Sequence, residues 1–270
     1  LKSSRYLGYA LYGTPTGTPV LFCHGFPGSR LEGALWHSAA AQHNVRLIVP
    51  DRPGAGFSSF QPRRRILDWP SDLLELLSHL HVNKFHILGT TGGSAYVLAC
   101  MHTLPERITS AAIVSGLYPL SLGAEDMLLM PRVMIFLATW MTTLLSILLD
   151  LMLGRAARNK DPSVFAAAFM KDVDMRPEID KVALSHDTVS RDQFIASVQE
   201  GLRPSSYAFA WEARLLGSDW GFDLEGLETK NLVLWHGKMD TGNPISMARR
   251  AKDKLKDAEL LELDEGHLSL

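Results

Sequence analysis

The chain has 270 residues, of which 46% are hydrophobic and 21% charged, and its formal net charge is -2. A chain of this length folds as one domain, or as one core domain with an insertion, and buries a sizeable core. Because no basic surplus is present to attract phosphates, we expect no nucleic-acid partner.

Cysteine content and hydropathy bear on the compartment. Cys23 and Cys100 lie in apolar runs and are too few for a disulfide framework, which favours buried thiols and a cytoplasmic protein. One uncharged run, residues 133–149, is at the lower end of the length that spans a membrane. Pro131 and Asp150 flank it closely and no second such run follows, so we expect a buried or lid helix rather than a membrane partner.

The first half of the chain alternates short apolar runs with helical patterns, which is typical of βαβ units and a mostly parallel sheet. Each apolar run is short and rich in branched residues, as buried strands are, and each intervening segment carries an apolar stripe at helical spacing. Strands are expected at 6–12, 20–23, 45–49, 84–88 and 110–114, and helices at 31–43, 67–81 and 94–102.

Between about residues 119 and 218 this alternation stops and the patterns are helical. An all-helical insertion in an α/β chain indicates a cap over the sheet. We therefore expect an α/β core formed by residues 1–118 and 219–270, with a helical cap formed by 119–218. The helices expected in the cap are 133–149, 162–171, 191–201 and 206–216, and the core resumes with a strand at 231–235, a helix at 246–255 and a strand at 258–263.

The most informative stretch, Gly89-Thr90-Thr91-Gly92-Gly93, lies where a predicted strand gives way to a helix. A strand-to-helix turn that exposes a nucleophile is sharp and strained, and it needs small neighbours. The glycine frame of the G-x-S-x-G pattern is intact, but Thr91 stands where serine is expected.

A nucleophilic hydroxyl needs a base, and the base needs an orienting acid. Asp240 and His267 each follow a predicted strand, at the sheet edge where open α/β sheets bind ligands, and Asp126 is a second candidate for the acid. A third strand end carries His24-Gly25-Phe26, a turn that can aim the Phe26 amide at a developing oxyanion. The Gly92 amide, at a helix N-terminus, would be the second donor.

Five motifs in this order resemble those of the α/β-hydrolase fold family, esterases and lipases among them. They are HGFPGS at 24–29, DRPGAGFSS at 51–59, GTTGG at 89–93, HGKMD at 236–240 and EGH at 265–267. The resemblance implies an α/β-hydrolase fold without metal or organic cofactor. It also implies that Thr91 takes the nucleophile position, Asp240 is the acid, His267 is the base, and Phe26 with Gly92 forms the oxyanion hole.

Other polar residues of these motifs have structural interpretations. His24 and His236 each precede a glycine at a strand end, which indicates that they brace loops. Asp51 is expected to accept hydrogen bonds from loop amides.

Thr91 leaves three interpretations open. A β-branched residue with positive φ stores about 1–3 kcal/mol of strain, and its methyl group crowds an approaching acyl carbon. The first interpretation is a hydrolase in which Thr91 attacks an ester or related acyl bond. The second keeps His267 and the oxyanion hole for C–C bond cleavage, condensation or cyclisation. The third is a catalytically disabled binding protein.

The cap segment is rich in large apolar side chains. Met130, Met134 and Trp140 are therefore expected to line a cavity for a medium-sized apolar small molecule. Surplus apolar surface on the cap helices could also pair with a second chain, which would give a homodimer.

Overall fold

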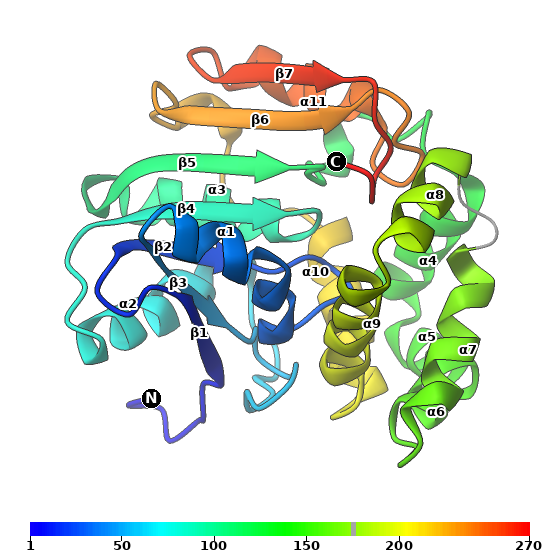
Figure 1. Ribbon diagram of the computed structural model, residues 1–270. Coiled ribbons are helices and arrows are strands. Elements are labelled where there is room, and N and C mark those ends of the chain that lie inside the picture. The colour runs from blue at the N-terminus through cyan, green and yellow to red at the C-terminus, as the bar shows by residue number, and fades with distance from the viewer. Residues whose placement is uncertain (174–176) are drawn as a thin grey trace.

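The structure, a computed structural model, describes residues 1–173 and 177–270. Its centre is a seven-stranded sheet in the order β1-β3-β2-β4-β5-β6-β7 (Figure 1). β1 pairs antiparallel with β3, and the other pairings are parallel, which confirms the mostly parallel sheet. The strands are β1 (Tyr9–Gly13), β2 (Thr18–Cys23), β3 (Val45–Pro50), β4 (Phe85–Thr90), β5 (Ile108–Val114), β6 (Leu232–Gly237) and β7 (Glu259–Leu263).

Helices cover both faces of the sheet because its strands are apolar on both sides. Along β2, Leu21 packs into the core beneath α2 and α3, while Phe22 belongs to the smaller cluster on the face that carries α1. Leu21 and Phe22 are therefore both fully buried, on opposite faces of the sheet. The covering helices are α1 (His37–Gln42), α2 (Trp69–His79), α3 (Gly93–Thr103) and α11 (Ile245–Lys254).

The helix expected at 31–43 is divided. Residues Arg30–Trp36 form a 3₁₀ helix, and only His37–Gln42 is α-helical. Ser29 caps the first part by accepting a hydrogen bond from the Leu31 amide at 3.3 Å. A Cβ on Gly33 would lie 2.6 Å from Val49, so this tight turn lets the segment approach the sheet closely.

The segment between β5 and β6 is helical, as predicted, and its helices lie beyond the carboxyl ends of the strands (Figure 1). They share an apolar cluster of their own. Residues 174–176 of the expected cap lie outside the described residues, and its limits at 119 and 218 stay a prediction. The helices are α4 (Leu129–Trp140), α5 (Thr142–Leu149), α6 (Arg155–Ala157), α7 (Pro162–Val173), α8 (Glu178–His186), α9 (Thr188–Leu202) and α10 (Ser206–Gly217).

The uncharged run at 133–149 forms two helices, α4 and α5, that break at Met141. One side is buried, with Leu145 and Leu149 in the cap core, but the other is open, with Trp140 75% and Ile147 53% exposed. The run is therefore buried on one face only, and its expected role as a lid stays a prediction. Within residues 1–173 and 177–270, no helix combines the length and the apolar character needed to cross a bilayer.

Candidate active site

The turn between β4 and α3 places Thr91 at the carboxyl end of the middle strand of the sheet. Its backbone has a φ of 44°, in the left-handed region that β-branched residues rarely adopt. The Thr91 amide donates to Val114 O at 3.0 Å, and its carbonyl oxygen accepts from the amides of Ser94 and Leu117 at 3.1 and 3.0 Å. These bonds hold the strained turn that the glycine pattern predicts.

Close packing explains the glycines of this turn. A Cβ on Gly93 would lie 2.1 Å from the carbonyl oxygen of Cys23, and one on Gly89 would lie 2.6 Å from Val97 Cγ2. The first contact would push α3 away from β2, and the second would push it away from β4. The glycines therefore fix how Thr91 stands above the sheet.

The structure brings Asp240 and His267 together. His267 Nδ1 lies 2.7 Å from Asp240 Oδ2, while Asp240 Oδ1 accepts from the amides of Gly242 and Asn243 at 2.8 Å each. Burial by itself would raise the pKa of Asp240, but the neighbouring His267 lowers it below its ordinary value. A charged Asp240 thus orients the imidazole through Nδ1 and leaves Nε2 as the nitrogen that can act as base.

A second histidine, His236, lies beneath this pair. Its Nε2 is 2.7 Å from Asn243 O and 3.7 Å from Asp240 Oδ2. Burial lowers the pKa of His236 despite the carboxylate nearby, so the ring is neutral. It braces the loop that carries Asp240, which matches the expected role.

The Thr91 hydroxyl lies against two backbone amides. Phe26 N donates to Thr91 Oγ1 at 2.9 Å, and Gly92 N donates to the same oxygen. These amides are the expected oxyanion donors, and here the oxygen they bind is that of Thr91 itself. Among the hydrogen bonds of the described residues, none joins Thr91 to His267.

Glu32, a buried carboxylate next to the Thr91 turn, was not among the residues predicted from the sequence. It accepts hydrogen bonds from Gly25 N at 2.8 Å and Thr90 Oγ1 at 2.6 Å, directly beneath the turn that bears Phe26. Burial raises the pKa of Glu32, partly offset by these hydrogen bonds. Glu32 follows the HGFPGS motif, but nothing local distinguishes it from an exposed helical glutamate.

His24 and Asp51 lie where the sequence indicates bracing groups. Burial lowers the pKa of His24 well below its ordinary value, and the neutral ring stays 2.9 Å from Gly25 O. Asp51 accepts from the amides of Arg30 and Phe57 at 2.7 and 3.0 Å, which confirms its predicted contacts with loop amides.

The residues proposed to line the substrate cavity have different surroundings. Met134 packs against the cap core, which Phe26 also contacts. Met130 and Trp140 are 64% and 75% exposed, and no described contact joins them to the Asp240–His267 pair. Asp126, the second candidate for the acid, is exposed and makes no described bond to His267.

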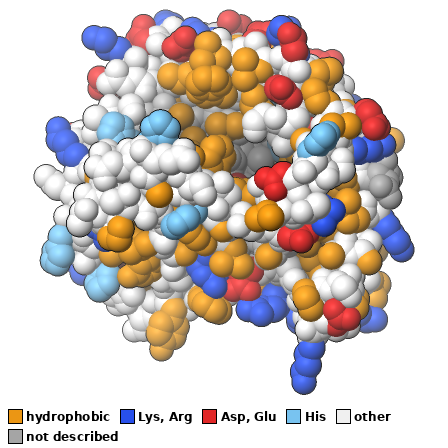
Figure 2. Space-filling model, in the orientation of Figure 1, with side chains coloured by type: hydrophobic (Ala, Val, Ile, Leu, Met, Phe, Trp, Pro, Cys, Tyr) orange, Lys and Arg blue, Asp and Glu red, His pale blue; other side chains and the backbone are white. Residues whose placement is uncertain are grey.

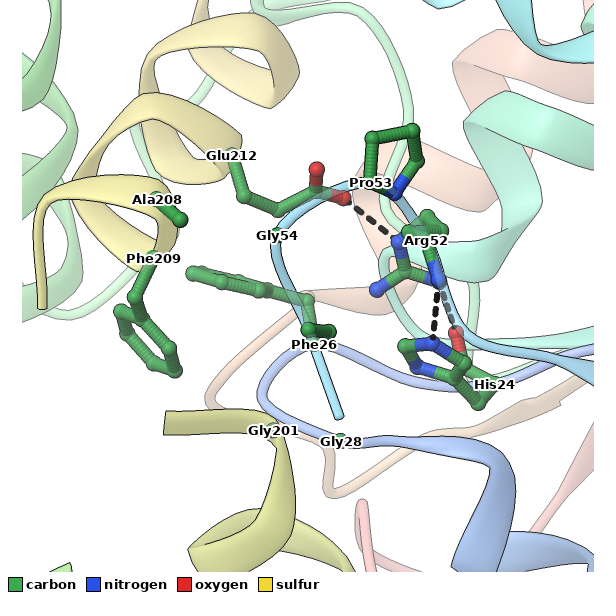
Figure 3. Close-up of a pocket in the computed structure, with 11 residues that line it drawn as sticks. His24, Phe26, Gly28, Arg52, Pro53, Gly54, Gly201, Ala208, Phe209 and Glu212 are labelled. Atoms are coloured by element: carbon green, nitrogen blue, oxygen red, sulfur yellow. Dashed lines mark hydrogen bonds and ion pairs between the residues drawn. The ribbon is translucent and has the colours of Figure 1, made fainter. Parts of the chain in front are cut away.

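Hydrophobic side chains gather along part of a hollow on one face of the molecule, and acidic and histidine side chains lie along its other margin (Figure 2). A pocket between core and cap is lined on one side by Phe26 and on the other by Ala208 and Phe209 of α10 (Figure 3). Arg52 and Glu212 form its polar wall. The space beside the turn that carries Phe26 is thus apolar at the rings of Phe26 and Phe209 and ionic at Arg52 and Glu212.

This sheet, with a strained strand-to-helix turn after β4 and an aspartate–histidine pair at its carboxyl edge, is the architecture of an α/β hydrolase. The family model for the alpha/beta hydrolase fold matches residues 18–270, and the chain belongs to this family.

Relatives by sequence match the chain over less than half of its length. A dihydrolipoyllysine-residue acetyltransferase component of an acetoin cleaving system from Pseudomonas putida is 34% identical over 42% of this chain and 30% of its own length. A probable proline iminopeptidase from Leptolyngbya boryana is 34% identical over 37% of this chain and 32% of its own length. The matches thus span about a third of these two curated relatives.

Solved structures resemble the chain along nearly its whole length. A hydrolase from Pseudomonas aeruginosa aligns with a TM-score of 0.67 at 20% identity, covering 100% of this chain and 90% of that one. An esterase from Rhodococcus sp. aligns with a TM-score of 0.66 at 18% identity, covering 98% and 89%. At such identities the likeness shows the fold.

Proposed function

We propose that the protein hydrolyses an ester or related acyl bond of a medium-sized apolar small molecule, with Thr91 as nucleophile, His267 as base and Asp240 as acid. The observation that carries this proposal is the 2.7 Å contact between His267 Nδ1 and Asp240 Oδ2, because it leaves Nε2 of His267 as a base at the sheet edge where Thr91 stands on its strained turn. Esterases among the structural neighbours and iminopeptidases among the relatives support acyl chemistry.

The reaction requires the Thr91 hydroxyl to turn about χ1 away from the two amides and towards Nε2 of His267. The substrate carbonyl oxygen then occupies the vacated position. Thr91 Oγ1 attacks the carbonyl carbon while His267 takes its proton, and the Phe26 and Gly92 amides stabilise the oxyanion. His267 returns the proton to the leaving alcohol, and water repeats the sequence to release the acid.

One observation favours a second function. Because the hydroxyl lies in the oxyanion position and is not bonded to His267, the site as it stands suits proton transfer without an acyl-enzyme. In that case His267 is a general base for C–C cleavage, condensation or cyclisation, and Thr91 helps the amides bind an enolate-like oxygen.

The test is hydrolysis of p-nitrophenyl butyrate by the wild type and three variants. We expect the wild type to turn over slowly, with a burst of acyl-enzyme. Thr91→Ser should raise the rate by up to about 10²-fold because the crowding methyl group is gone. Thr91→Ala and His267→Ala should each lower the rate by at least about 10³-fold.

Three results decide among the functions. Unchanged turnover in Thr91→Ala excludes covalent catalysis and supports the second function. No reaction in the wild type, with ligands from a metabolite extract still bound by His267→Ala, supports a binding protein. Ester turnover that depends on both residues supports the hydrolase.

A further inference from the structure

A buried arginine connects the cap to the turn that carries the oxyanion donor. Arg52, 2% exposed, follows β3, and its Nε lies 2.7 Å from Oε1 of Glu212 in α10 (Figure 3). The sequence motif contains Arg52, but its cap partner lies far along the chain. The ion pair therefore joins the α/β core to the helices beyond the carboxyl ends of the strands.

Arg52 holds the peptide whose other side is the oxyanion donor. Its Nη2 donates to Gly25 O at 2.8 Å, and its Nη1 donates to His24 O at 2.5 Å. The Gly25–Phe26 peptide is planar, and its carbonyl and amide point in opposite directions. By fixing Gly25 O, the planar guanidinium fixes the direction of Phe26 N, which lies 2.9 Å from Thr91 Oγ1.

Glu212 is itself held firmly. Its second carboxylate oxygen accepts from Tyr96 Oη at 2.9 Å and pairs with Arg64. Burial by itself would raise the pKa of Glu212, but Arg64 and Arg52 beside it lower the pKa below its ordinary value. The carboxylate is therefore charged and keeps Arg52 in place.

The same face of α10 contacts both oxyanion donors. Phe209 packs on Phe26 with ring centroids 4.5 Å apart, one turn before Glu212. One turn further on, Leu216 is so close that a Cβ on Gly92 would lie 2.8 Å from its Cδ1. Residues at these spacings share one side of a helix.

We propose that Arg52 is a positioning residue for the oxyanion hole and that Glu212 makes its position depend on the seating of α10. The cap then does more than cover the substrate, because the Phe26 amide points correctly only when α10 is docked on the core. This inference rests on the proposed function, since acyl transfer is the chemistry for which the Phe26 amide is proposed to bind an oxyanion.

The test compares Arg52→Lys and Glu212→Gln with a matched control, Glu262→Gln. Lysine keeps the charge but cannot bind both carbonyls and Glu212 at once, and glutamine keeps the shape of Glu212 without its charge. The control removes a carboxylate that pairs with Arg249 at 2.6 Å on the surface.

Two readouts separate the inference from the proposed function. With p-nitrophenyl butyrate, we expect kcat to fall about 10²-fold in Arg52→Lys and about 10-fold in Glu212→Gln, with KM nearly unchanged, as for loss of one oxyanion donor. In protein labelled with ¹⁵N-phenylalanine, the Phe26 amide signal should shift in both variants. The control should match the wild type in both readouts.

A Phe26 signal that stays in place in both variants overturns the inference, whatever the rates. A shifted Phe26 signal together with a lower kcat and an unchanged KM supports the inference. If the wild type hydrolyses no ester, the proposed function fails, and the Phe26 signal still tests the link between α10 and the turn. Should Glu212→Gln not fold, Glu212→Asp, which keeps the carboxylate but draws it back from Arg52 Nε, tests the same link.

Discussion

Asp240 determines which nitrogen of His267 is available for chemistry. Its Oδ2 accepts from Nδ1 at 2.7 Å, and a neutral asparagine in its place could present an N–H there instead. We therefore expect Asp240→Asn to lower kcat by about 10³–10⁴-fold through the wrong tautomer, with little effect on KM. Steady-state kinetics on the activated ester measures this, and a loss below tenfold would contradict the role of the acid.

Asp240 also links stability to pH. Although burial opposes it, the neighbouring His267 lowers the pKa of Asp240 in the folded state. A lowered folded pKa contributes stability that is present above the unfolded value, about 3.9, and is lost as pH falls through the folded pKa. The Tm of the wild type should therefore exceed that of Asp240→Asn above pH 4 and approach it at lower pH. A difference in Tm that widens on acidification would rule this out.

The sequence predicts residues whose roles are encoded locally. Thr91, Asp240 and His267 lie in short motifs at strand ends, so their places follow from the strand pattern and the glycines around them. Glu32 and Glu212 carry no local sign, because each acquires its role from partners in other elements. A local sequence pattern does not show which charged residues pair across the fold, so these two roles could not be predicted.

Among the elements, the approach of α3 to β2 determines how far the Thr91 turn stands above the sheet. Alanine at Gly93 would place its Cβ 2.1 Å from Cys23 O, whereas alanine at Gly226 meets no atom within 4 Å. We expect Gly93→Ala to destabilise by about 1–3 kcal/mol or more through overpacking, and Gly226→Ala to leave the free energy of unfolding within about 1 kcal/mol. Urea denaturation measures both, and equal stabilities would contradict the packing argument.

The strands and most core helices follow from the sequence because apolar alternation follows burial directly, whereas the helix expected at 31–43 is α-helical only at His37–Gln42. The break between α4 and α5 was not predicted, since the run of apolar residues around Met141 contains no glycine, proline or charge to mark an end. Packing provides the break instead. Thr142 Oγ1 donates to Ala138 O at 2.6 Å and accepts from Arg214 of α10 at 3.2 Å, so the end of the helix is set from outside it.

In the molecule as a whole, the cap has both an inner and an outer apolar surface. The inner one forms the cap core with α10, and the outer one leaves Phe136 59% and Met152 69% exposed. Exposed apolar side chains of this size are the feature on which a homodimer through the cap helices was predicted. That pairing stays a prediction.

The left-handed backbone at Thr91 also sets a limit on thermal stability. At a φ of 44°, a side chain with a Cβ costs about 1–2 kcal/mol that glycine does not pay. Thr91→Gly and Thr91→Ala both lack the hydroxyl, so they differ in this strain and, in the opposite direction, in the greater unfolded-chain entropy of glycine, about 0.4–1 kcal/mol. Because the strain is the larger of the two, we expect the glycine variant to melt about 2–4 °C higher than the alanine variant in calorimetry, and a higher Tm for the alanine variant would show an unstrained turn. The conformation that presents the Thr91 side chain at the sheet edge is thus one that the backbone would hold more easily with no side chain at all.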